Sequence, residues 1–502
     1  MAEILILTIL AALVGLYSLL PPHKQLRLRY GAGPKTKTLL AALASLIILF
    51  SLTDSFLQHN YPEHTLTAGE FYTSTFFLLE AFQIIATLGI VSVFLNLLVL
   101  KTPTISNTAY FNEKIRELLN KEDYTTVIEL LNDHYDELFH PDNNRYSEIL
   151  DTVDTGLQRR GIIQEIADYH PDFALRVIED QHLDTISRKT FVSNYLETLF
   201  KNETSILYRE LWDTQAMKKG HQYRYNIPEN NRLLKALFDD CEIAADLDVY
   251  NPIRNVVFDH LREQEKKDYD EYNDFDIKYG PSPDRSTFQD PLVAAVHFYD
   301  IMVTEALYQG IDWHMNLYDF DSFTARICRN FETTENTDLT SEFPNKYAYI
   351  LHEIVWRARR WGECGAEDLD QLDLDLEHTD RRHENTNIVK STIRCLTKCG
   401  RLILSNDEIP EEFKEWVSKD IYCLYFKFVL SDDPEAQRYG VVMADCFEEQ
   451  MNRRDEGDEF RRVFYRHLTI EDGIMRSNVL YREGGVSELE DLKKQIKPSS
   501  TS

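Results

Sequence analysis

The stretch LLAALASLIILF, residues 39–50, contains only apolar and small side chains. With its flanks it forms a segment of about residues 38–57, close to the ~20 residues that an α-helix needs to cross a bilayer. Similar apolar segments cover about residues 4–20 and 71–100. We therefore predict three transmembrane helices. The third would be ~45 Å long as a helix, so we expect it to tilt or to extend beyond the membrane.

Basic residues are distributed unequally between the two connecting loops. The loop between the second and third segments contains no Lys or Arg but has Asp54, Glu63 and Glu70. The loop between the first two segments is basic and contains Lys24, Arg27, Arg29, Lys35 and Lys37. Short basic loops remain on the cytoplasmic side. The pattern predicts a multi-pass protein of the cell membrane (inner or plasma), with its N-terminus outside and residues 101–502 in the cytoplasm.

The rest of the chain has the spacing of consecutive helices. From Asn107 onward, apolar residues recur at helical intervals, and short breaks such as His170-Pro171-Asp172 separate them. The chain has only 18 glycines and contains neither a P-loop nor a dinucleotide-binding fingerprint. We predict an all-α fold, with the three membrane helices followed by a large helical bundle or an irregular α-solenoid, and no cofactor.

Composition shifts divide this predicted fold into parts. Residues 1–101 form the membrane domain, and residues 102–267 form a first helical subdomain. Residues 268–290 mix acidic and aromatic side chains and read as a loop. Residues 291–490 form a second helical subdomain, and residues 491–502 read as a disordered tail.

The formal charge of −30 comes from the predicted cytoplasmic part, residues 102–502, which carry −31. Residues 102–502 hold 48 of the 54 basic residues and 79 of the 84 acidic residues. Such a surface repels nucleic acid phosphates, so we expect no nucleic acid partner. The seven cysteines are scattered, which is typical of reduced thiols rather than of a disulfide framework.

The third membrane segment carries a polar stripe formed by Thr73, Glu80, Gln83 and Thr87. On a single helix these residues fall within an arc of roughly 80°. Intramembrane polar residues face a bundle interior or a water-filled cavity. We favour a structural role, in which the stripe joins helices, and keep an ion or proton pathway as the alternative. The stripe would also suit a homo-oligomer.

A basic patch lies at residues 356–361, which read WRARRW. Its candidate binding residues are Trp356, Arg357, Arg359 and Arg360. The stripe of expected core positions comprises Tyr347, Ile350, Ile354, Ala358 and Trp361, which turns Arg357 and Arg360 outward. We favour pairing of these arginines with the acidic segment Glu363–Glu384; the alternative is recognition of an anionic ligand or partner.

An acidic stretch resembles a calcium-binding loop only in part. Asp373, Asp375, Glu377 and Glu384 occupy positions 1, 3, 5 and 12 of the loop pattern, but His378 stands where the loop needs glycine. A solvated acidic loop is the better interpretation, and we predict no metal site.

Two further pairs carry weak chemical signals. Cys395 and Cys399 share a helix face, but zinc would need two more ligands. Arg462 and His467 have a spacing found in some helical ribonucleases, with His as general acid–base and Arg on a phosphate. A helix with one apolar face is the better explanation of the second pair, and the net acidity of the chain further disfavours phosphate chemistry. The outer loop adds His59, Glu63 and His64, which we interpret as ordinary loop polarity.

These observations favour a binding role over catalysis. The leading hypothesis is a membrane-anchored cytoplasmic scaffold or sensor that binds an unidentified cytoplasmic protein or small ligand. An oligomeric channel or membrane-perturbing effector, gated by the helical domain, is the first alternative. A membrane-tethered hydrolase is the second.

Overall fold

The computed structural model consists almost entirely of helices, which make up 82% of it. Strands in the described part form two short antiparallel hairpins. The all-α prediction is therefore confirmed. The structure describes residues 2–31, 34–60, 65–68, 71–95, 105, 107–139, 146–181, 183, 186–219, 222–264, 288–311, 316–331, 346–367, 388–454, 456–470 and 485–497.

The chain divides into two compact units. The first contains residues 1–173 and 182–191, and the second contains residues 174–181 and 192–502. The expected loop at residues 268–290 is described only from residue 288, and the expected tail only up to residue 497. The loop therefore remains a prediction, whereas residues 491–496 of the expected tail belong to helix α26 (Gly485–Ile496).

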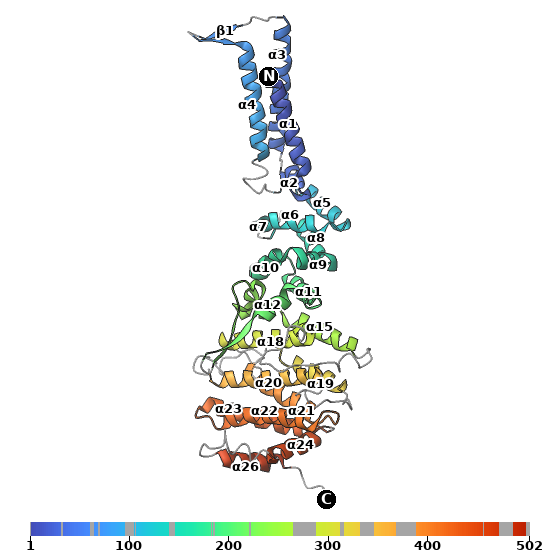
Figure 1. Ribbon diagram of the computed structural model, residues 1–502, viewed down its shortest axis with the longest axis vertical. Helices are drawn as coiled ribbons and strands as arrows, with labels where there is room; N and C mark the ends of the chain where they lie inside the picture. The colour runs from blue at the N-terminus through green and yellow to red at the C-terminus, as the bar shows by residue number, and fades with distance from the viewer. Residues whose placement is uncertain are drawn as a thin grey trace. The chain divides into compact units, whose positions relative to one another are not determined.

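The first unit begins with three long helices that lie side by side (Figure 1). Helix α4 packs against both α3 and α1. The short helix α2 lies at one end of this group, and the β1–β2 hairpin lies at the other. The elements are α1 (Ala2–Leu19), α2 (Pro22–Gly31), α3 (Pro34–Asn60), β1 (Thr65–Ala68), β2 (Phe71–Ser74) and α4 (Thr75–Leu95).

Two details differ from the sequence prediction. The basic loop between the first two apolar segments is largely helical, as α2. The third segment does not start as a helix at Phe71, because Phe71–Ser74 pairs with Thr65–Ala68 and α4 begins only at Thr75. Thr, Phe and Tyr favour extended backbone, which accounts for the hairpin.

One helix in the described part is long and apolar enough to cross a membrane, over Thr36–Thr53. Leu78–Val93 in α4 is a shorter apolar helix. The structure thus provides one candidate span where the sequence predicts three, and the other two remain predictions.

Five shorter helices complete the first unit. Helix α5 packs against α6 and α8, and α6 packs against α9. The side chain of Asn107 caps α5 by accepting a hydrogen bond from the N–H of Tyr110 at 3.0 Å. The helices are α5 (Thr108–Asn120), α6 (Tyr124–Asp133), α7 (Tyr135–Phe139), α8 (Ser147–Leu157) and α9 (Arg160–Tyr169).

The second unit stacks its longer helices in layers (Figure 1). Helix α20 packs on α18, and α21 and α22 pack on α20, with α24 beyond them. The elements of this unit, with two that adjoin the first, are α10 (Pro171–Glu179), α11 (Arg188–Phe200), α12 (Ile206–Asp213), β3 (Gln215–Lys219), β4 (Gln222–Asn226), α13 (Arg232–Phe238), α14 (Cys241–Asp246), α15 (Tyr250–Gln264), α18 (Pro291–Tyr308), α19 (Asp319–Arg329), α20 (Lys346–Glu367), α21 (Ile388–Leu404), α22 (Glu411–Val429), α23 (Pro434–Met451), α24 (Gly457–Ile470) and α26 (Gly485–Ile496).

Helix α18 forms the centre of the second unit. Asp290 caps it by accepting from the N–H of Leu292 at 2.8 Å, and Pro291 occupies its first turn, where a missing N–H costs nothing. Fifteen of its eighteen residues are buried. Burial on all sides follows because α15, α20 and β4 cover different faces of the helix.

Candidate functional site

The contact between α3 and α4 contains the polar residues of the predicted intramembrane stripe. Gln83 is fully buried, and its Nε2 donates to Ser51 Oγ at 3.2 Å. Thr87 is also buried and donates to the carbonyl of Gln83 at 2.8 Å. No hydrogen-bond partner for Gln83 Oε1 is found among the described residues. Close packing surrounds these groups, since a Cβ on Gly89 would lie 3.3 Å from Leu43 Cδ1.

The predicted stripe does not lie on one helix. Thr73 belongs to β2, which ends before α4 begins, so it is not part of a stripe on that helix. Glu80, Gln83 and Thr87 remain on α4, and only the last two are buried, with Glu80 half-exposed. The inward polar group on α4 is therefore the pair Gln83 and Thr87, both neutral.

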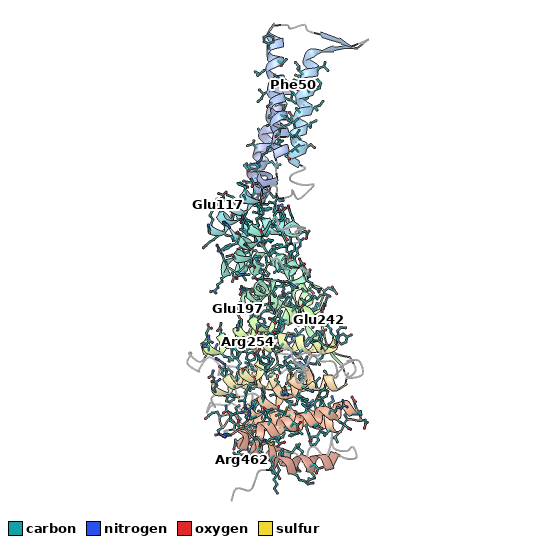
Figure 2. The ribbon with its side chains drawn as sticks, turned by 180° about the vertical axis from the view of Figure 1, so that it is seen from behind. Phe50, Glu117, Glu197, Glu242, Arg254 and Arg462 are labelled. Carbon is teal, nitrogen blue, oxygen red and sulfur yellow. The ribbon has the colours of Figure 1, made fainter. Side chains whose placement is uncertain are left out.

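The outer surface of the three long helices is apolar. Two thirds of the exposed large hydrophobic side chains in the described part, twelve of eighteen, lie between residues 14 and 88. Phe50 on α3 (Figure 2) stacks on Phe82 of α4 with ring centroids 5.6 Å apart. The twelve are Val14, Leu16, Leu19, Leu39, Leu46, Ile48, Leu49, Leu52, Phe56, Phe82, Ile85 and Leu88. Soluble monomers rarely expose large apolar patches, so the concentration of these side chains on one group of helices favours a surface that contacts something other than water.

Helix α2 links this helical group to the rest of the first unit. It packs against α6, and its Leu26 is buried. The His23 imidazole lies against the carboxylate of Glu129 on α6. The chain between α1 and α3 and the chain that follows α4 therefore lie at the same end of the three helices.

The arginines of the basic patch lie inside the second unit. Asp300, fully buried on α18, accepts hydrogen bonds from Arg357 and Arg360. It also accepts from Trp361 Nε1 at 2.8 Å and from the hydroxyl of Tyr225. Burial alone would raise the pKa of Asp300, but the two guanidinium charges outweigh it and hold that pKa well below its usual range.

Three more carboxylates complete the pairing. Arg357 Nη2 lies 2.7 Å from Glu353 Oε2. Arg359 bridges Glu363, at 2.8 Å, and Asp420 of α22, at 2.6 Å. The ring of Trp356 lies 4.9 Å from the guanidinium carbon of Arg360, a cation–π contact. Two of the four carboxylates, Asp300 of α18 and Asp420 of α22, therefore connect α20 to the helices on which they lie.

The expected outward orientation of Arg357 and Arg360 is wrong. The core stripe, Tyr347 to Trp361, is buried as predicted, but Arg360 is only 4% exposed and also faces the interior. The reason is that α20 lies between two layers and buries two faces, whereas the prediction assumed one. The sequence signal for the partner was Asp300, one of two carboxylates, with Glu305, in an otherwise mostly apolar helix.

The weaker motifs do not assemble into a site. Cys395 Sγ and Cys399 Sγ lie 3.9 Å apart, and Thr324 donates to Cys399 at 3.2 Å. Arg462 is exposed and pairs with Glu459, whereas the side chain of His467 is buried. The region described contains no group of three or more metal-ligating side chains. Asp373, Asp375, Glu377 and Glu384 lie outside the described residues, as do Glu63, His64 and the side chain of His59.

Comparison with known proteins does not assign the chain to a family. No protein-family model matches the chain, and no curated protein matches it in sequence. Its function is therefore inferred from two features of the chain itself. These are the apolar surface of α1, α3 and α4 and the internally paired helical layers of the second unit.

Proposed function

We propose that this protein is a membrane-anchored scaffold or sensor, with α1, α3 and α4 in the bilayer and its helical layers in the cytoplasm. The observation that carries the proposal is the exposed apolar surface, which is concentrated on these three helices. Transfer of such side chains from water to hydrocarbon is favourable by a free energy of about 25 cal/mol for each Å² of apolar surface removed from water.

The packing of α2 against α6 supports the proposed topology. If each long helix crosses the bilayer once, residues 20–33 and the residues after α4 emerge on the same side, as the contact requires. The basic residues between the first two apolar segments, such as Lys24 and Lys37, support a cytoplasmic location for that side. The β1–β2 hairpin is then outside the cell.

The second unit suits a scaffold because its helices are fixed to one another by buried pairs. Asp300 and Asp420 join α20 to helices on either side of it. The strongly negative charge of residues 102–502 favours partners with a basic contact surface and disfavours nucleic acids. A cytoplasmic protein with a basic face is the partner class that we propose.

An oligomeric channel is the second candidate, and one observation favours it. Gln83 Oε1 is buried between α3 and α4 without a partner in the described part, and such a group could face water in an assembly. A channel predicts that Glu80→Gln and Gln83→Leu change ion flux in proteoliposomes. An anchor predicts that both leave the flux unchanged.

The test of the scaffold is recovery of a partner from membranes. The full chain should stay in the membrane pellet after alkaline carbonate washing, and one cytoplasmic protein should co-purify with it in mild detergent. That protein should dissociate as salt rises, because the proposed contact is electrostatic. Release of the chain by carbonate would contradict the anchor, and a salt-insensitive partner would contradict the acidic contact.

A further inference from the structure

Helix α2 is held close to the ends of two of the three long helices. Two residues separate it from α1, and two more separate it from α3. Two residues reach at most about 7 Å, and α2 lies at one end of the helical group (Figure 1). The headgroup layer is about 5–8 Å thick on each side of the hydrocarbon core of a bilayer. With α1 and α3 in a bilayer, both ends of α2 therefore lie at the level of the headgroups.

The charge of this part of the chain is opposite to that of the rest. Residues 4–53 contain five basic residues and no acidic residue. We call these five the basic cluster; they are Lys24, Arg27 and Arg29 of α2 and Lys35 and Lys37 of α3. The cluster carries +5 within fourteen residues, whereas residues 102–502 carry −31. Because an anionic bilayer repels the acidic part, any attraction to anionic lipids has to come from the basic cluster.

Lys24 and Lys37 are accessible to a ligand. Both are exposed, and neither forms an ion pair with a residue that the structure describes. A different face of α2 contacts protein, because His23 and Leu26 are buried and α2 packs against α6. The carboxylate of Glu129 lies against His23 on that face. Packing on α6 therefore leaves Lys24 exposed.

The preferences of isolated helices do not account for the positions of these cations. Lys24 is the third residue of α2, and Lys35 and Lys37 are among the first four residues of α3. Neither first turn contains an acidic residue. A helix start carries the positive end of the helix dipole, so it favours acidic side chains and disfavours basic ones. An anionic surface beside both helix starts would offset this repulsion.

We propose that α2 and the start of α3 bind the headgroups of anionic phospholipids. Lys24 and Lys37 contact the lipid phosphates, and the rest of the basic cluster adds to the local attraction. Clusters of about four to eight Lys and Arg beside a membrane helix are typical of such recognition. This inference rests on the proposed insertion of α1, α3 and α4 in the bilayer, and it adds the class of lipid that the anchor recognises.

The experiment is native mass spectrometry of the purified full chain in mild detergent, which counts the lipids bound to each chain. Phosphatidylglycerol and phosphatidylcholine are titrated separately, as the anionic and the zwitterionic probe. The parent should bind phosphatidylglycerol more tightly, and this affinity should fall as ammonium acetate is raised. Each lysine near an anionic surface contributes about fivefold in affinity. Lys24→Gln with Lys37→Gln should therefore weaken phosphatidylglycerol binding by up to about thirtyfold and leave phosphatidylcholine binding unchanged.

Matched variants keep the test decisive. Lys419 and Lys497 are exposed lysines of the second unit, so Lys419→Gln with Lys497→Gln makes the same change of charge and should bind both lipids as the parent does. Circular dichroism reports folding. Should the double variant of Lys24 and Lys37 not fold, Lys24→Gln alone decides, with weakened phosphatidylglycerol binding in support and unchanged binding against.

Failure of this inference is distinguishable from failure of the anchor. Equal affinity of the parent for the two lipids, unchanged affinity of the folded double variant, or an equal loss in the control would overturn the lipid preference. A chain that also stays in carbonate-washed membranes would then have an anchor without that preference. A chain that carbonate releases would contradict the anchor, and this inference with it.

Discussion

Helices α3 and α18 have similar apolar compositions but opposite surroundings. In α18, fifteen of eighteen residues are covered by other helices of the chain. In α3, only 6% of the stretch Thr36–Thr53 is buried. A helix that is apolar on all sides is either a buried core helix or a membrane helix, and the sequence pattern alone does not separate the two. The neighbours of each helix make the distinction.

The polar residues of the two regions differ accordingly. α18 contains Asp300, a full charge that two guanidinium groups, an indole and a phenol satisfy. The α3–α4 contact contains the neutral Gln83, with one hydrogen bond of 3.2 Å to Ser51. A helix covered by protein can hold a charge because its counter-ions are supplied by neighbours. A pair of helices with apolar outer faces holds only neutral polar groups at its centre.

Removing the charge of Asp300 should have the largest effect. Asp300→Asn removes the carboxylate charge that Arg357 and Arg360 share inside the unit, and Arg357 keeps its pair with Glu353; the loss should lower the free energy of unfolding by about 3–5 kcal/mol. Denaturant unfolding of the full chain in detergent, followed by circular dichroism, measures the change. Asp321→Asn is the matched control, because Asp321 forms a more exposed pair with Lys398 at 3.1 Å and should cost at most about 1 kcal/mol. Equal losses in the two variants would mean that the Asp300 cluster does not hold the layers together.

A second buried carboxylate in the same unit, Asp319, should change the stability with pH in the direction opposite to Asp300. Asp319 is buried with weak partners: the hydroxyl of Tyr299 is 3.5 Å away and Arg254 is 3.9 Å away. Burial raises the pKa of Asp319 to about 6. A raised carboxyl pKa means that the folded state holds its proton more tightly, so this stability is present below pH ~4 and is lost as pH rises through 6.

In the parent, the free energy of unfolding should therefore fall by at most about 3 kcal/mol between pH ~4 and 6 because of Asp319. Asp319→Asn should remove this fall. Unfolding measured at half-unit pH steps in parent and variant tests this. Asp300 has a lowered pKa, so its contribution is present above pH ~4 and is lost only in stronger acid. Parallel pH profiles for parent and Asp319→Asn would contradict the expected difference.

The close packing of α3 on α4 should tolerate size changes poorly at one glycine. A Cβ at Gly89 would lie 3.3 Å from Leu43, so Gly89→Leu should separate the helices and cost about 1–3 kcal/mol. Gly15 on α1 has no atom within 4 Å of such a Cβ, and Gly15→Leu should be silent. The detergent denaturation midpoint of the helical signal compares them. A greater loss for Gly15→Leu would show that α1, rather than α3, packs closely in this group.

The smallest effect should come from the polar centre of this contact. Gln83→Leu removes one hydrogen bond to Ser51, and such bonds between membrane helices average about 0.6 kcal/mol. The same denaturation midpoint should therefore shift only slightly. A loss as large as that of Asp300→Asn would show that the two regions use polar groups in the same way.

The sequence was sufficient for features that depend on local periodicity. The helical spacing after Asn107 and the core stripe from Tyr347 to Trp361 appear in the structure as predicted. It was insufficient wherever a second element decides the outcome. Arg357 and Arg360 point inward because α18 supplies Asp300, which is 57 and 60 residues away. Likewise, Thr73 is in a strand because residues 65–68 pair with it.

We propose that α1, α3 and α4 cross the membrane and leave the helical layers in the cytoplasm. Reporter fusions in cells test this topology most directly, with a reporter that is active only outside the cytoplasm placed after Glu63 and, separately, after Ser502. We expect activity at Glu63, in the connection between α3 and α4, and none at Ser502. Activity at Ser502 with silence at Glu63 would reverse the topology, and silence at both sites would show that the apolar surface of these helices does not lie in a membrane.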